Sequence, residues 1–225
     1  MTYYESTGHL LLTPVDREAP ARVARLRELG LGERADPELD AFAREVAGIT
    51  GTPYAAVNFI DEERQFFAGL HHRADAPAGA YTGRVLARDH GYCPHVVVRR
   101  RALVLEDVRD FARFAPNAVV EEDGVRSYLG APLTDRQGFV LGTVCAVDLV
   151  PRRWGREGLE TIKGLAAELV KVLHAREDAA ALAAEPGRGG DPGRGGSRAQ
   201  GGSQGRGGAP GRGRGPGRGP DRDPV

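Results

Sequence analysis

The segment from Phe139 to Leu149 constrains the fold of this chain most, because almost every residue in it is apolar. Side chains alternate between the two faces of an extended strand, so the segment presents an apolar set on each face. The sets are Val140, Val144 and Ala146 on one face, and Leu141, Cys145 and Val147 on the other. A strand that is apolar on both faces lies at the centre of a sheet, with helices covering it from two sides.

A polar, glycine-bearing turn at residues 134–138 joins this strand to an earlier strand-like run from Ser127, and together they predict a hairpin. Pro151 follows the hairpin and stops its second strand. Asp148 closes the apolar run. A carboxylate at a strand end either caps the following turn or binds an arginine, so we expect one of these two roles for it.

The spacing of apolar residues predicts three helices, over residues 16–31, 36–48 and 156–184. Asp16 and Asp36 stand at the N-cap positions of the first two, and Pro37 stands at the first helical position of the second. These signals give definite starting points for the first two helices.

Between the helices, residues 53–70 predict a further hairpin and residues 101–105 a short strand. We expect one helix, or two short ones, within residues 85–98. Residues 106–122 predict a loop with a helical turn around Phe114. The order of elements predicts an α+β domain, in which a mostly antiparallel sheet has helices packed on its faces.

The composition changes abruptly near residue 185 to Gly, Arg, Pro, Ser and Gln. This tail has no aromatic residue and too few apolar side chains to offset the entropy of ordering, so we predict that residues 185–225 are disordered. Residues 1–15 lack periodicity and predict a flexible arm, which leaves one domain over residues 16–184. The 31 basic and 31 acidic residues balance, but the tail has eight Arg and three Asp, so an acidic domain carries a basic tail.

No apolar run approaches the length of about 18 residues that a membrane-spanning helix needs. The N-terminal segment has no basic stretch before its short apolar run at residues 10–12, so it does not match a signal peptide. Two cysteines far apart in sequence fit reduced thiols better than a disulfide framework. We therefore expect a soluble cytoplasmic protein without membrane association.

Four segments of the chain, taken in order, resemble the GAF sensory domain. They are TPYAAVNFIDEERQFFAGL, GYCPHV, LVLEDVRDFARFAPNAVV and RSYLGAPLTDRQGFVLGTVCAVDLVPR. The resemblance covers residues 20–178, and the high Ala and Arg content fits a GC-rich, actinomycete-like bacterial source. It implies a sensory module that binds a small molecule or mediates dimerisation, and that signals through its terminal helices. The sequence holds no kinase, cyclase or DNA-binding domain, so we expect output through a separate partner protein.

Three positions that would shape the pocket depart from the pattern of close relatives: Phe66, Ser127 and Leu129. The motif of cyclic-nucleotide-binding relatives is absent, which disfavours that ligand class. The resemblance therefore does not identify the ligand.

Aromatic residues around a cavity favour a flat or apolar ligand. The candidate pocket residues are Phe59, Phe67, Cys93, His95, Phe111, Phe114, Tyr128 and Cys145. The alternative is that most of these aromatic side chains simply build the core. Haem, or a bilin attached to Cys93, is compatible with the residues but not indicated, and the spacing of the histidines matches no metal signature.

Cys93 stands near the predicted start of a helix, where the pKa of a thiol can fall. The alternative is that Cys93 and Cys145 are small buried hydrophobic side chains. A methionine sulfoxide reductase of the GAF type would use Cys93 but needs a resolving cysteine nearby. Two cysteines far apart in sequence do not obviously supply that arrangement.

The leading hypothesis is a non-enzymatic sensor that dimerises through residues 16–31 and 156–184. The runner-up is a thiol enzyme of the sulfoxide-reductase kind that uses Cys93. A third is an interaction scaffold whose Gly-Arg-Gly tail binds RNA weakly. Asp107 and Arg126 could hold a polar ligand group, but we favour a structural ion pair between them.

Overall fold

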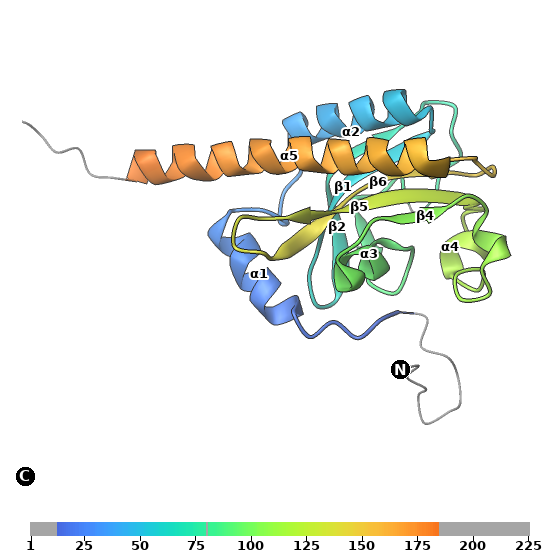
Figure 1. Ribbon diagram of the computed structural model, residues 1–225, viewed down its shortest axis with the longest axis horizontal. Coiled ribbons are helices and arrows are strands. Elements are labelled where there is room, and N and C mark those ends of the chain that lie inside the picture. The colour runs from blue at the N-terminus through green and yellow to red at the C-terminus, as the bar shows by residue number, and fades with distance from the viewer. Residues whose placement is uncertain (1–12, 80, 185–225) are drawn as a thin grey trace, which may run out of the picture. The chain divides into compact units, whose positions relative to one another are not determined.

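A six-stranded antiparallel sheet lies at the centre of the computed structural model, which describes residues 13–79 and 81–184 (Figure 1). Its strands stand in the order β3-β2-β1-β6-β5-β4. Their bounds are Tyr54–Ile60 (β1), Arg64–His72 (β2), Val85–Ala87 (β3), Leu103–Leu105 (β4), Ser127–Thr134 (β5) and Val140–Asp148 (β6). The predicted α+β class is confirmed. Most of the predicted arm and all of the predicted tail lie outside the described residues.

β6 lies between β1 and β5, and all of its residues are buried, as predicted for a strand that is apolar on both faces. The predicted faces are wrong at one end of the strand. β5 pairs Leu133 with Gly142 and Thr134 with Val140, which leaves Leu141 as an extra residue in a bulge. Because of this bulge, Leu141 packs on the face of Val144 and Ala146, and Val140 packs on the face of Cys145 and Val147.

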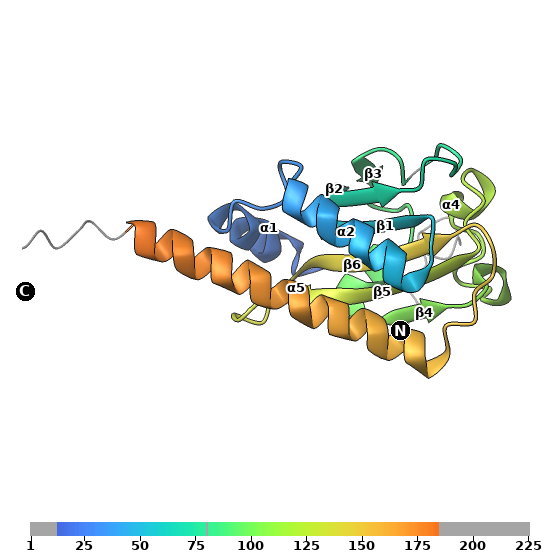
Figure 2. The same cartoon turned by 90° about the horizontal axis from the view of Figure 1, so that it is seen from above.

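Helices cover both faces of the sheet (Figures 1 and 2). One face is packed by α2 (Pro37–Thr50) and α5 (Gly155–Ala184), with α1 (Ala19–Glu28) at its end. The other face is packed by α3 (Cys93–Arg99), together with the short helix α4 (Ala118–Glu121) and the 3-10 turn η1 (Val108–Asp110). None of the described helices is both long enough and apolar enough to cross a bilayer.

α2 begins where Asp36 and Pro37 predict it and runs to Thr50, two residues past the predicted end. The Asp36 side chain accepts hydrogen bonds from the backbone N–H groups of the first turn, and Pro37 follows it in the helix. Gly51 closes the helix with a φ of 67°, a left-handed conformation that glycine adopts without strain. The last helix is also confirmed, over Gly155–Ala184.

α1 begins later than predicted, at Ala19, and its N-cap is Glu18 rather than Asp16. Asp16 lies two residues earlier, where its carboxylate accepts the Glu18 N–H and pairs with Arg22. The side chain predicted as a helix cap therefore anchors the approach to the helix instead.

The helical prediction for residues 85–98 is only half right. Val85–Ala87 forms the edge strand β3 and pairs with β2, and the helix is confined to Cys93–Arg99. Gly91, with a φ of 77°, turns the chain between the two elements, and Pro94 occupies the first turn of α3. In the loop over residues 106–122, η1 and α4 flank the predicted turn around Phe114.

Candidate functional site

The sheet divides the apolar core into two clusters, and most predicted pocket residues lie in the one beneath α3. That cluster contains Phe67, Cys93, Phe114, Tyr128 and Cys145. Two further residues lie next to it. The His95 ring meets the Phe114 ring edge-on at 5.0 Å, and Phe111 packs on Phe114 but is 41% exposed.

Phe59 does not lie with the other candidates, which corrects its predicted placement. It points to the opposite face of β1, into the cluster that α2 and α5 cover. Its neighbour Asn58 takes the α3 side instead, because adjacent residues of a strand face opposite ways. Phe59 is therefore a core residue away from the candidate site.

Two thiols meet at the centre of the cluster beneath α3. Cys93 is the first residue of α3 and Cys145 lies on β6, yet their Sγ atoms are 3.8 Å apart. The Tyr128 hydroxyl, on β5, donates a hydrogen bond to Cys93 Sγ at 3.3 Å. Both cysteines are buried, as their reading as small hydrophobic side chains predicts. The fold thus brings together two cysteines whose sequence positions did not obviously supply a neighbouring pair.

Polar side chains surround the Cys93 sulfur, and two of them are not among the residues predicted from the sequence. Asn58 on β1 and Thr143 on β6 both interact with Cys93 and are fully buried. We call Asn58, Cys93, Tyr128, Thr143 and Cys145 the buried polar cluster. The feature of the sequence that could have identified these two residues is an amide and a hydroxyl side chain within two otherwise apolar strands.

Three buried polar atoms in and beside this cluster have no hydrogen-bond partner of normal geometry among the described residues: Asn58 Oδ1, Thr143 Oγ1 and the Tyr81 hydroxyl oxygen. Asn58 uses its Nδ2 atom to donate to Gln65 Oε1 at 2.9 Å, so only its oxygen is left over. Tyr81 stacks on Phe67 with ring centroids 5.7 Å apart. An unpaired buried polar atom costs about 1–3 kcal/mol, so three together call for an explanation.

The ionisation of the two thiols is unequal. Burial opposes ionisation of Cys93, but the thiol, hydroxyl and amide groups of Cys145, Thr143, Tyr128 and Asn58 around its sulfur outweigh burial and lower the pKa of Cys93 to about 6. The hydrogen bond to Cys93 and burial both raise the pKa of Cys145. Burial also raises the pKa of Tyr128, so its hydroxyl keeps the proton that it donates to the sulfur. Of the two thiols, Cys93 is therefore the one that ionises more readily.

Hydrogen bonds and ring contacts hold the turn at Gly91 that leads into α3, the helix over the cluster. Asn117, at the N-cap of α4, accepts a hydrogen bond from the Gly91 N–H at 2.8 Å and donates back to the Gly91 carbonyl at 3.2 Å. Tyr92 packs edge-on against both Phe114 and Tyr128. The turn before α3 is thus held both to α4 and to the sheet.

The predicted ion pair of the neighbouring loop is confirmed. Arg126 donates through Nε to Asp107 Oδ1 at 3.0 Å, and its Nη2 also contacts that carboxylate. The Arg126 guanidinium lowers the pKa of Asp107. Asp148 performs both roles expected of a strand-end carboxylate, since it accepts from the Leu149 N–H and binds Arg152.

A separate groove of about 630 Å³ lies on the other side of the sheet, between β5 and α5. Small apolar residues such as Ala131 and Ala166 line it, with Arg101 and Lys163 at its border. It contains none of the predicted site residues, so we place the candidate site in the buried polar cluster.

Comparisons with known proteins agree with this fold. A profile of the GAF domain matches residues 35–173. The chain is 28% identical over 141 residues to a cyclic di-GMP phosphodiesterase of Pseudomonas aeruginosa. That match takes 62% of this chain but only 23% of the phosphodiesterase, so the chain spans less than a quarter of that relative.

Two solved structures share the architecture. One is a free methionine-R-sulfoxide reductase from Neisseria meningitidis in complex with its substrate, with a TM-score of 0.51 and 17% identity over 74% of this chain and 96% of that one. The other is a far-red cyanobacteriochrome photoreceptor, with a TM-score of 0.52 and 10% identity over 70% of this chain and 94% of that one. At these identities the likeness establishes the fold alone.

Proposed function

The chain belongs to the GAF domain family, a sensor fold of signal transduction, and on that premise we propose that it binds a small polar molecule at the buried polar cluster. The observation that carries the proposal is the set of three polar atoms in and beside this cluster, on Asn58, Thr143 and Tyr81, that have no hydrogen-bond partner among the described residues. A ligand that donates to the Asn58 oxygen and meets the two hydroxyl groups would remove the cost of leaving them unpaired.

The residues of the cluster limit the chemistry of this ligand. The cluster contains no Arg, Lys, Asp or Glu side chain, and Cys93 is the most readily ionised group in it. A buried anion would therefore meet no compensating positive charge and would repel the thiolate. We expect an uncharged ligand with hydrogen-bond donors, small enough to fit beneath α3. Such a ligand enters when the turn at Gly91 and α3 move away from the sheet.

A matched pair of threonine variants tests this proposal. Thr143→Val keeps the shape of the side chain but removes the hydroxyl from the cluster, whereas Thr134→Val makes the same change at the far end of β5. We expect native mass spectra of the full-length protein from its own host to show a retained small molecule in the wild type and in Thr134→Val, and its loss in Thr143→Val. The proposal fails if the wild type carries no added mass and gains no thermal stability from a panel of neutral amides, imidazoles and purine bases.

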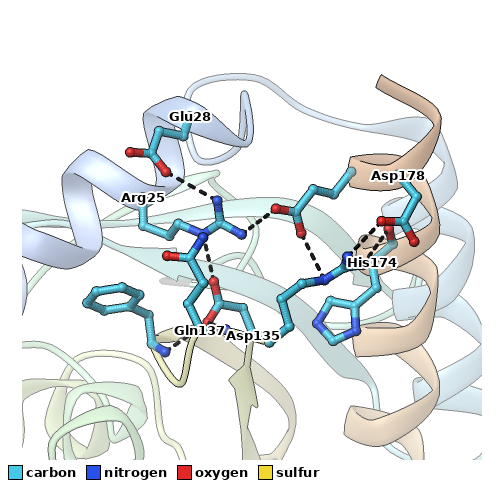
Figure 3. Close-up of polar contacts among 9 residues, drawn as sticks. Arg25, Glu28, Asp135, Gln137, His174 and Asp178 are labelled. Carbon is cyan, nitrogen blue, oxygen red and sulfur yellow. Dashed lines mark hydrogen bonds and ion pairs between the residues drawn. The ribbon is translucent and has the colours of Figure 1, made fainter. Parts of the chain in front are cut away.

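We propose that the signal leaves through the terminal helices. β5 and β6 carry Tyr128, Thr143 and Cys145, and the turn that joins these strands contacts both α1 and α5. Figure 3 shows Arg25 of α1 beside Asp135 of that turn. A ligand that favours one position of the hairpin therefore favours one packing of the two helices.

We also propose that the protein forms a homodimer and that the dimer passes its signal to a separate partner protein. α5 carries two exposed large apolar side chains, Val172 at 43% and Leu182 at 72% exposure, and its C-terminal end extends beyond the sheet (Figure 2). A second copy of α5 would cover them. We expect the wild type to sediment as a dimer and Leu182→Glu to sediment as a monomer with an unchanged circular dichroism spectrum. Identical sedimentation of the two proteins would remove this part of the proposal.

A thiol reductase is the second candidate, and the 3.8 Å approach of Cys93 to Cys145 is the observation that favours it. Cys93 would attack the sulfoxide and Cys145 would resolve the sulfenic acid that results. The full burial of both thiols argues against ready access of a substrate as large as methionine sulfoxide. Turnover of free methionine sulfoxide by the wild type, lost in Cys93→Ser, would support it.

A further inference from the structure

The contact between Cys93 and Cys145 joins two elements that are far apart in the sequence. Cys93 lies on α3 and Cys145 on β6, 52 residues later, and their Sγ atoms are 3.8 Å apart. Both thiols are free and fully buried. Two small hydrophobic side chains would pack equally well without the ring of polar groups that surrounds these sulfurs. The surroundings suit thiol chemistry better than simple packing.

We propose that Cys93 and Cys145 are a two-electron redox pair, which a hydroperoxide converts into an intramolecular disulfide between α3 and β6. This modification site is independent of the sensor function proposed above, because it requires only the two thiols and an oxidant of this class.

The chemistry balances with one peroxide per pair. The Cys93 thiolate attacks one oxygen of hydrogen peroxide, the O–O bond breaks, and the departing hydroxide takes a proton to become water. The sulfenic acid on Cys93 then loses its hydroxyl to attack by Cys145 sulfur, whose proton leaves with that hydroxyl as a second water. The two thiols give up two electrons, and the peroxide is reduced to two waters. A small dithiol reverses the change by exchange and is itself oxidised.

The two sulfurs have separate tasks in this scheme. Cys93 has the environment of a nucleophile, since the Tyr128 hydroxyl donates to its sulfur and supports the thiolate. Cys145 keeps its proton, with a pKa raised by the bond to Cys93 and by burial, and so acts second. We therefore expect Cys93 to be oxidised first and Cys145 to resolve it.

Closing the disulfide requires a small movement of the structure. A disulfide holds its sulfurs about 2 Å apart, so the atoms must approach each other by nearly half of their present separation. The movement falls to α3, a helix of only seven residues, because β6 is paired with a neighbouring strand on each side. The bond would fasten α3 to β6 over the buried polar cluster. Cys93 could then no longer ionise.

Because the two thiols are buried, we expect small oxidants to react with them and large oxidants not to. Hydrogen peroxide is close to water in size, whereas glutathione disulfide and alkylating maleimides are far larger. We expect hydrogen peroxide to form the disulfide in the folded protein, and glutathione disulfide to leave both thiols free over the same time.

The experiment treats the full-length reduced protein with equimolar hydrogen peroxide, then unfolds it in the presence of N-ethylmaleimide. We expect the intact mass to fall by two hydrogen atoms with no maleimide added, and a non-reducing digest to contain the peptides of Cys93 and Cys145 joined to each other. Dithiothreitol should restore two reactive thiols. Two maleimides on the peroxide-treated protein, or a disulfide only between two chains, would overturn the proposal.

Two single variants separate the tasks of the sulfurs. Cys145→Ser should stop at a sulfenic acid on Cys93 that dimedone traps when the peroxide-treated protein is unfolded in its presence, whereas Cys93→Ser should add no dimedone under the same treatment. Equal labelling of the two variants would overturn the assigned order of reaction. Because the wild-type experiment uses no substitution, poor folding of either variant leaves the test of the disulfide intact. Ligand retention, measured on reduced protein, tests the sensor proposal separately.

Discussion

Arg25 Nε donates to Asp135 Oδ2 at 2.7 Å and so ties α1 to the turn between β5 and β6 (Figure 3). The other oxygen of Asp135 accepts the backbone N–H groups of Gln137 and Phe139, which gives the turn its shape. Arg25 also reaches Glu177 of α5 through Nη2 at 2.6 Å. One arginine thus contacts the hairpin that carries the candidate site and the last helix of the domain.

Arg25→Gln should weaken this junction. The Arg25 and Asp135 side chains are only 6% and 3% exposed, so the substitution leaves a buried carboxylate without its charged partner. We expect a loss of about 3 kcal/mol in the free energy of unfolding, measured by urea denaturation, and faster hydrogen exchange in α1. Arg136→Gln is the matched control, because the Arg136 pair with Asp178 is solvent-exposed and should contribute little. Equal losses in the two variants would contradict the role given to Arg25.

Asp36 should contribute to stability in two separable ways. It caps α2, and its Oδ2 atom binds Arg176 of α5. Asp36→Ala removes both contributions, and we expect it to cost about 1 kcal/mol or more in urea denaturation. Asp36→Asn keeps the cap but loses the charge, so it should retain part of that stability. Glu38→Ala serves as the control, since Glu38 also binds Arg176 but is mostly exposed.

The contribution of Asp36 should depend on pH. Burial alone would raise the pKa of Asp36, but hydrogen bonds from Arg176 and from the backbone of α2 lower it below 3.8. A carboxylate whose pKa is lowered by folding stabilises the native state above the pKa of the unfolded chain, and the effect disappears as pH falls through the folded pKa. The difference in stability between wild type and Asp36→Asn should therefore be full at neutral pH and shrink below about pH 4. A constant difference across that range would contradict the argument.

Local signals predicted most of the fold because the forces behind them act within a few residues. The central position of β6 followed from its apolar faces, and the start of α2 followed from Asp36 and Pro37. The ion pair between Asp107 and Arg126 was also predicted, since the two charges stand on neighbouring elements.

The candidate site was harder to predict because it depends on strand register. The Leu141 bulge exchanges the faces of Val140 and Leu141, and nothing in an apolar run on both faces signals where a bulge falls. Phe59 was misplaced for the same reason, since β1 is buried on both sides. The approach of Cys93 to Cys145 depends on how α3 packs over the sheet, which no local pattern specifies.

Substitution by alanine should lower the stability of the protein at Gly142 and raise it at Gly164. A Cβ atom on Gly142 of β6 would lie 1.9 Å from the Asn58 carbonyl oxygen, which cannot move without breaking the pairing of β1 with β6. A Cβ atom on Gly164 of α5 would meet nothing within 4 Å. We expect Gly164→Ala to raise the free energy of unfolding by about 1 kcal/mol, because alanine favours a helix interior. Gly142→Ala should lower stability enough to reduce soluble yield, and a stable, soluble Gly142→Ala protein would contradict the register of these strands.

The thiolate of Cys93 should be visible as a titration near pH 6. Polar groups around its sulfur lower the pKa of Cys93 to about 6 against the opposing effect of burial, whereas the pKa of an unperturbed thiol is 9.0. The folded state then binds fewer protons than the unfolded chain between these values, so this thiol should make the protein more stable as pH rises from about 6 to about 9. The ultraviolet absorbance of the thiolate should rise over the lower part of that range in the wild type and stay flat in Cys93→Ser.

Tyr128→Phe removes one donor to the sulfur and should move the titration of Cys93 to higher pH. Tyr92→Phe is the matched control, because the Tyr92 hydroxyl lies in the same core but contacts the Phe114 carbonyl instead. An unchanged titration in Tyr128→Phe would mean that its hydrogen bond does not support the thiolate. In that case the nucleophilic role of Cys93 would rest on Asn58, Thr143 and Cys145 alone.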